Sequence, residues 1–207
     1  MTRSRALITA AATRRFLEDG YPATSVDDVA AEAGVSKRTV YNVFDDKEQL
    51  FRAIILQAID TAERFSTTLA ASIATAADVD VALRELARLL AESVLGGLVV
   101  PLRRLLIAEA VRFPDLAAEY RERAPERVMA GIAEALEAFR QRGALEFDDA
   151  ALAAEHFAFL AIGASLDRAL FVAAPATGPG GGPVEVAAAV DRAELGAAAF
   201  LQAYAAR

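Results

Sequence analysis

Residues 25–44 read SVDDVAAEAGVSKRTVYNVF, and this stretch decides how the rest of the chain is interpreted. Thr24 or Ser25 can cap one short helix and Ser36 a second, because a hydroxyl accepts a hydrogen bond from a free first-turn N–H. Gly34 stands between the two predicted helices, where a residue that tolerates positive φ is needed. The stretch therefore predicts two short helices joined by a tight turn, a helix-turn-helix arrangement.

The second of these helices begins with cationic and hydroxyl side chains, which suit the major groove of DNA. Arginine and lysine reach guanine acceptors there, and asparagine pairs with adenine. Serine and tyrosine hydroxyls contact phosphates, and a lysine at a helix start lies where backbone N–H groups also favour phosphate. The alternative is a solvated helix end with ordinary surface charge. The candidate DNA-binding residues are Ser25, Ser36, Lys37, Arg38, Thr39, Tyr41, Asn42 and Lys47.

The composition excludes several kinds of active site. The 207 residues include no cysteine and one histidine, so disulfides, thiolate metal sites and a two-histidine metal site within one chain are excluded. No phosphate loop or catalytic motif is found, and we expect a protein that is not an enzyme and holds no cofactor or metal. The net charge of −7 disfavours indiscriminate binding of nucleic acid. Residues 1–50 hold seven Lys/Arg against eight Asp/Glu, so only −1 of this charge lies there.

Apolar residues recur at helical spacing along nearly the whole chain, and no window alternates as a strand does. The sequence predicts an all-α protein of about nine helices. Residues 1–46 are expected to form a three-helix DNA-binding domain, and residues 47–207 a larger helical effector-binding and dimerisation domain. The helix at 47–69 would connect the two. Residues 174–183, rich in proline and glycine, predict a loop.

The last two predicted helices are candidates for a dimer interface. The helix at 149–172 is apolar on two faces, which indicates burial on more than one side, and the last helix repeats small residues. Packed on their counterparts, the two would form a four-helix interface. The alternative is that they only close the core of one chain. The candidate interface residues are Phe157, Ala161, Ala164, Ala193, Gly196, Ala197 and Phe200.

The apolar second half also predicts a cavity of roughly 300–1,000 Å³ for an apolar or amphiphilic small molecule. His156 could contact such a ligand or sense pH, and its alternative role is that of a hydrogen-bonded core residue. Core residues and pocket residues have the same apolar character, so each candidate could line a pocket or belong to the core. The candidate lining residues are Phe65, Leu90, Phe113, Met129, His156 and Phe159.

Residues 20–51, GYPATSVDDVAAEAGVSKRTVYNVFDDKEQLF, resemble the N-terminal signature of the TetR family of bacterial transcription regulators. The resemblance covers about residues 5–55, and a weaker one continues at 107–120. Arg15 stands where the family usually has an apolar residue. Val43 replaces a His or Tyr that commonly contacts phosphate, so DNA binding is expected to depend more on Lys37, Tyr41 and Lys47.

The resemblance implies a cytoplasmic homodimer that binds a near-palindromic operator. Such a protein is most often a repressor that a small molecule releases from DNA. An activator of the same fold would share every feature above. A helical ligand-binding protein without DNA binding would explain the apolar second half, but not the residues at 36–39.

Overall fold

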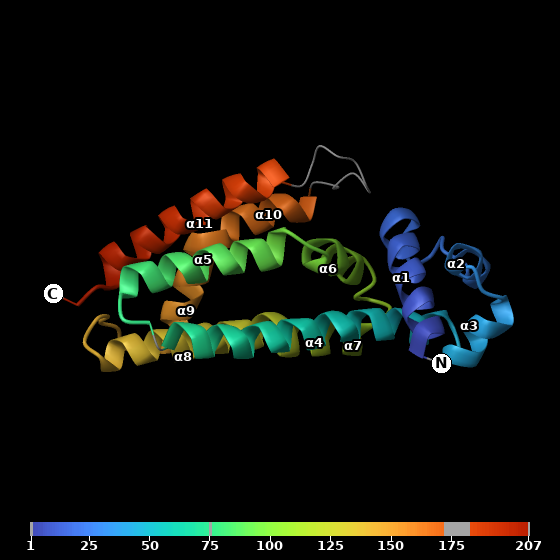
Figure 1. Ribbon diagram of the computed structural model, residues 1–207, viewed down its shortest axis with the longest axis horizontal. Helices are drawn as coiled ribbons and strands as arrows, with labels where there is room; N and C mark the ends of the chain where they lie inside the picture. Colours follow the sequence, from blue (N-terminus) through green and yellow to red (C-terminus); the bar gives the residue numbers. More distant parts are fainter. Residues whose placement is uncertain (1, 75, 172–182, 207) are drawn as a thin grey trace. The chain divides into compact units, whose positions relative to one another are not determined.

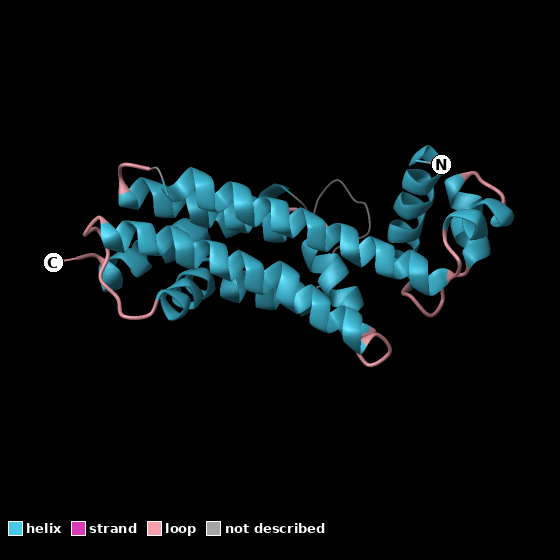
Figure 2. Ribbon diagram, turned by 90° about the horizontal axis from the view of Figure 1, so that it is seen from below, coloured by secondary structure: helices cyan, strands magenta, loops and turns pink. Residues whose placement is uncertain are grey.

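The computed structural model describes residues 2–74, 76–171 and 183–206, and the chain forms two compact units. Unit 1 comprises Met1–Asp60 with Pro101–Tyr120, and unit 2 comprises Thr61–Val100 with Arg121–Arg207. The described residues contain no strand, only an isolated bridge from Leu145 to Ala205 (Figure 2). If each uninterrupted run is counted once, these residues form nine helices. The all-α prediction is confirmed.

The first three helices of unit 1 begin and end at the residues that the sequence indicated. A capping box closes the start of α2: Ser25 Oγ accepts from the N–H of Asp28, whose carboxylate accepts from the N–H of Ser25. Gly34 ends α2 in the left-handed region at φ 65°. The three helices, blue in Figure 1, are α1 (Thr2–Asp19), α2 (Val26–Ala33) and α3 (Lys37–Val43). Their buried apolar residues include Ile8, Ala12, Phe16, Val29, Val40 and Phe44.

Unit 1 is larger than the predicted domain of residues 1–46. It also takes in the first half of α4 (Lys47–Ala74), most of α6 (Val99–Ala108) and nearly all of α7 (Pro114–Arg121). Phe16, Tyr21, Phe51 and Phe113 pack as one aromatic cluster, with ring centroids 4.9–5.7 Å apart. Phe113, in the segment 101–120, therefore belongs to a core that also includes residues of α1 and α4.

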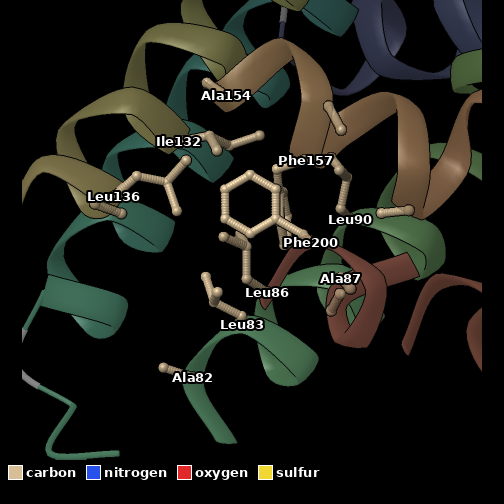
Figure 3. Packing of buried hydrophobic residues seen from close by; sticks show 14 of the residues in the cluster. Ala82, Leu83, Leu86, Ala87, Leu90, Ile132, Leu136, Ala154, Phe157 and Phe200 are labelled. Carbon is tan, nitrogen blue, oxygen red and sulfur yellow. The ribbon is translucent and has the colours of Figure 1, made fainter. Parts of the chain in front are cut away.

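Unit 2 is a bundle in which α11 lies along α5 and also packs on the π-helical turn of the preceding run (Figure 1). Phe157 and Phe200 lie between the leucines of α5 and the side chains of Ile132 and Leu136 on α8 (Figure 3). The predicted loop at 174–183 lies outside the described residues, except for the proline with which α11 begins. The helices are α5 (Val79–Leu95), α8 (Arg127–Gln141), α9 (Ala150–Ala158), α10 (Ala164–Phe171) and α11 (Pro183–Tyr204).

Two π-helical turns, η1 (Glu122–Glu126) and η2 (Phe159–Gly163), continue the helices on either side without a break. Pro125 accounts for η1, since it has no N–H and its ring crowds the carbonyl one turn earlier. The wider turn relieves that contact and lets the helix continue through the proline. The π-turn η2 is closely packed: a Cβ added at Gly196 on α11 would lie 2.3 Å from the carbonyl oxygen of Leu160.

Candidate nucleic-acid interface

The exposed face of α3 carries the side chains that the sequence assigned to DNA. Lys37, Arg38, Tyr41 and Asn42 are all exposed, at i, i+1, i+4 and i+5, and so lie on one side of the helix. Val40 and Phe44 lie on the other side and are buried in unit 1. A short helix thus presents four polar groups within two turns, while its apolar side holds it in place.

The serine hydroxyls at the starts of α2 and α3 cap these helices. Ser36 Oγ accepts from the N–H of Thr39 at 3.1 Å and lies 2.8 Å from the Thr39 hydroxyl. Ser25 Oγ lies 2.5 Å from the carboxylate of Asp28, and this hydrogen bond lowers the pKa of Asp28. Both serines are exposed, so each side-chain oxygen can accept a further hydrogen bond, while the Ser25 hydroxyl already donates to the Asp28 carboxylate.

The two cations of α3 differ in their surroundings. Lys37 Nζ lies 2.8 Å from Asp27 Oδ2 on α2, and this hydrogen bond raises the pKa of Lys37. Both side chains are more than half exposed, so water screens the pair. Arg38 has no hydrogen-bond or ion-pair partner among the residues that the structure describes. Its five guanidinium donors are therefore free to bind a partner from outside the chain.

Lys47 was predicted to bind DNA, but the structure directs its ammonium group into unit 1. Its Nζ donates to the backbone carbonyls of Tyr21 and Thr24, at 2.8 and 2.9 Å, and lies 3.4 Å from that of Pro22. Burial lowers the pKa of Lys47, and the charge of Arg112 lowers it further. No spacing in the sequence separates such an inward lysine from a phosphate-binding one, because the loop it contacts lies more than 20 residues away.

Comparisons with known proteins identify this arrangement. Residues 8–54 match the family described as bacterial regulatory proteins, tetR family. Residues 81–206 match the family described as AefR-like transcriptional repressor, C-terminal domain, which spans more than half of the chain. The chain belongs to the TetR family. It is a DNA-binding transcription regulator, and repression and ligand response are typical of that family.

Individual relatives agree with this assignment. A solved structure of a TetR-family regulator from Mesorhizobium loti is 30% identical, with a TM-score of 0.84, and the match covers 99% of this chain and 98% of that one. The flavonoid-responsive regulator FrrA is also 30% identical, with a TM-score of 0.68 and full coverage of both chains. The HTH-type regulator YhgD of Bacillus subtilis is 50% identical over 48 residues, 23% of this chain and 25% of YhgD.

The two departures from the TetR signature are accommodated locally. Arg15 does not enter the core, because it pairs with two carboxylates. Its Nε lies 2.8 Å from Glu32 Oε2, at an angle that makes this an ion pair without a hydrogen bond. Its Nη1 lies 3.3 Å from Asp19 Oδ2. An ion pair thus joins α1 to α2 at this position. Val43 borders a surface groove of about 480 Å³. The groove is lined by Arg5, Val43, Phe44, Asp45, Gln49, Arg52, Ala53, Leu56, Gln57 and Asp60. Arg5, which the sequence analysis did not single out, also stacks its guanidinium 4.5 Å above the Phe44 ring.

The residues that were assigned to a dimer interface lie mostly inside this TetR-family chain. Six of the seven candidate interface residues are buried within a single chain, and only Ala164 among the seven is exposed. A buried side chain has no surface left to offer a second copy, and we correct the choice of residues accordingly. The buried residues are Phe157, Ala161, Ala193, Gly196, Ala197 and Phe200.

A different face of the same helices is apolar and exposed. Leu152, Phe159 and Leu160 are 48%, 68% and 48% exposed, and Leu195 on α11 is 68% exposed. Gly196, which follows Leu195 in the chain, lies against the Leu160 backbone. We call these four residues the apolar patch. Phe159 and Leu160 are the first two residues of the π-helical turn η2.

The run that carries most of this patch, Ala150–Phe171, has the length and the mean hydropathy, 1.3, of a membrane span, judged over the described residues. Core helices pass the same test, and 39% of the 18-residue window with this hydropathy is buried inside the chain.

The six candidate pocket residues do not line one site. Phe113 belongs to the aromatic cluster of unit 1, while Leu90 lies in the core of unit 2 with Phe65 and Met129 packed against it. Phe159 belongs to the apolar patch. His156 is exposed, and its Nδ1 is hydrogen-bonded to the Tyr204 hydroxyl.

Proposed function

We propose that the chain is a homodimeric, cytoplasmic repressor that binds a near-palindromic operator and is released by a small molecule. One observation carries the proposal: α3 presents four exposed polar side chains on a helix anchored by its buried face. The described repressor function of the family that matches residues 81–206 supports repression over activation. Binding, with no catalytic step, is the whole of the proposed activity.

Affinity for the operator would rest on a few placed contacts. The first 50 residues carry a formal charge of −1, so bulk electrostatic attraction to DNA is weak. Arg38 is the proposed reader of a base, since its guanidinium is exposed and unpaired and matches the O6 and N7 acceptors of guanine. Asn42, one turn later, would read a neighbouring base, and Ser25, Ser36, Thr39 and Tyr41 would contact phosphates.

Dimerisation would double these contacts. A two-fold axis places two α3 helices in successive major grooves, about 34–36 Å apart. The apolar patch is the proposed interface, in place of the buried residues first assigned to it. Residues 47–207 keep their proposed role in effector binding and dimerisation.

The proposed effector is apolar or amphiphilic. The apolar character of unit 2 supports this class, and FrrA, which resembles the chain over its whole length, is a flavonoid-responsive regulator by name. A flat aromatic compound with polar edges falls within the same class. Titration of the operator complex with apolar aromatic and amphiphilic compounds is the direct screen.

Arg38→Ala is expected to weaken operator binding by about 1–3 kcal/mol, because the variant loses a base contact. Genomic DNA fragments selected by the wild-type protein supply the operator, and fluorescence anisotropy on that fragment and on random duplex measures the loss. Arg88→Ala is the matched control, since Arg88 lies in unit 2 and, among the described residues, pairs with Glu85 and Glu92 of its own helix α5. An equal loss on random DNA would demote Arg38 to a phosphate contact, and a wild-type protein that selects no fragment would refute the proposed function.

Asp27→Asn is expected to strengthen DNA binding by about 2- to 5-fold at low salt. The substitution removes a negative charge beside α3 and frees Lys37 for phosphate, and an exposed pair of this kind contributes little to stability. The gain should shrink as salt is raised, because screening weakens the new contact. Weaker binding by Asp27→Asn would show that the pair orients Lys37 productively.

A further inference from the structure

The ring of Tyr21 is the point where three segments of unit 1 meet. Lys47 Nζ lies 4.4 Å from the ring centroid, and the Arg112 guanidinium carbon lies 5.4 Å from it. Phe51 and Phe113 lie against the ring, with centroids at 4.9 and 5.2 Å. Two cations within about 6 Å of one ring is a cation–π arrangement, and its strength depends on the exclusion of water. The Tyr21 ring is 5% exposed and so is shielded from water, whereas the Arg112 side chain is 56% exposed.

The second cation comes from the turn between α6 and α7. The carbonyl of Glu109 accepts from the N–H groups of Arg112 and Phe113, each at 2.9 Å, which closes the turn. The Glu109 carboxylate is largely buried and lies 3.5 Å from Arg112 Nε. This pair keeps Arg112 beside Tyr21, and Glu109 partly balances the two positive charges.

Lys47 holds the loop that leads into α2. Its Nζ has three donors, and it gives two short hydrogen bonds to carbonyls of that loop and a longer contact to a third. The cap residue Ser25 comes directly after the last of these carbonyls, that of Thr24. A shift of Lys47 would therefore move the start of α2 and, through the Gly34 turn, α3.

We propose that Lys47 is a positioning residue, which sets the orientation of α2 and α3, and that the 109–113 turn controls this setting through the ring of Tyr21. The inference rests on the proposed function and names a route of regulation for the same DNA site. The turn leads into α7, which continues without a break into η1 and α8. A ligand that displaces α7 would thus change DNA affinity through the loop at 20–24, in addition to any movement of α4.

The salt dependence of binding separates a positioning lysine from a phosphate contact. Lys47→Met and Arg112→Gln are compared with the wild-type protein on the selected operator fragment, in a series of salt concentrations. Each is expected to lower affinity about tenfold or more, the range of coupling between distinct sites. The slope of log K against log salt should not change. A phosphate contact would reduce that slope by about 0.9. The double variant should lose less than the product of the two single losses, because both act on one ring.

Asp115→Asn is the matched control. Asp115 also joins residues 101–120 to α4, through hydrogen bonds of 2.7 and 3.1 Å to Arg52, but it does not contact the loop. Its loss should change operator affinity by no more than about twofold. Arg112→Gln, at a half-exposed side chain, keeps the test decisive if circular dichroism shows Lys47→Met to be unfolded.

The possible results distinguish failure of the positioning role from failure of the proposed function. If the wild-type protein binds its operator, either of two results would overturn the positioning role. One is a slope lowered by about 0.9 for Lys47→Met, and the other is unchanged affinity for Arg112→Gln. Independent, multiplicative losses would likewise overturn the coupling. Failure of the wild-type protein to select any fragment would refute the proposed function itself.

Discussion

Phe159→Asp is expected to leave the chain folded, convert the dimer to a monomer and lower operator affinity by about 100-fold or more. The side chain is 68% exposed in one chain, so its replacement opens no cavity in the core. In a dimer that buries the apolar patch, the new carboxylate would be desolvated without a partner, which costs about 3–5 kcal/mol. Each factor of ten in affinity corresponds to about 1.4 kcal/mol, which gives the expected loss.

Light scattering at a series of protein concentrations measures the mass, and circular dichroism confirms the helices. Val111→Asp is the matched control, because Val111 is 97% exposed and belongs to unit 1, whereas all four residues of the apolar patch belong to unit 2. It should leave the mass unchanged. A dimer of unaltered stability in Phe159→Asp would rule out the patch as the interface. Ala197→Glu does not test the dimer, since Ala197 is buried and the charge would enter the core of one chain.

Phe200→Ala is expected to destabilise unit 2 by about 3–5 kcal/mol. The ring is fully buried, lies perpendicular to Phe157 at 5.4 Å and stacks on Tyr204 at 4.4 Å. Truncation loses these contacts and leaves a cavity that the surrounding α5 and α8 side chains fill only in part (Figure 3). Urea unfolding followed by circular dichroism measures the change.

The Phe159→Asp background makes this measurement specific, because unfolding of a monomer involves no subunit dissociation. Truncation of a core residue lowers the stability of the monomer by the full amount, whereas truncation of an interface residue would not change the stability of a monomer. Phe171→Ala is the matched control: it removes the same ring at a site that is 82% exposed and should change stability by no more than about 0.5 kcal/mol. A loss below about 1 kcal/mol for Phe200→Ala in that background would contradict the core placement.

Local chemistry made the DNA-binding helices predictable from sequence. The Ser25 and Ser36 caps, the Gly34 turn and the buried spacing of Val40 and Phe44 all act within a few residues. Such interactions need no knowledge of distant segments, so the exposed face of α3 could be assigned in advance.

The sequence by itself determined that the chain is helical, where the helix-turn-helix lies and which side of α3 faces outward. The tertiary structure decided which side of the apolar helices is core, so that Phe157 is buried while Phe159 is exposed two residues later. It also decided that Lys47 turns inward and that residues 101–120 belong to the same compact unit as the DNA-binding helices. The physical reason is common to all three: burial depends on the partner that a side chain meets, and these partners lie tens of residues away along the chain.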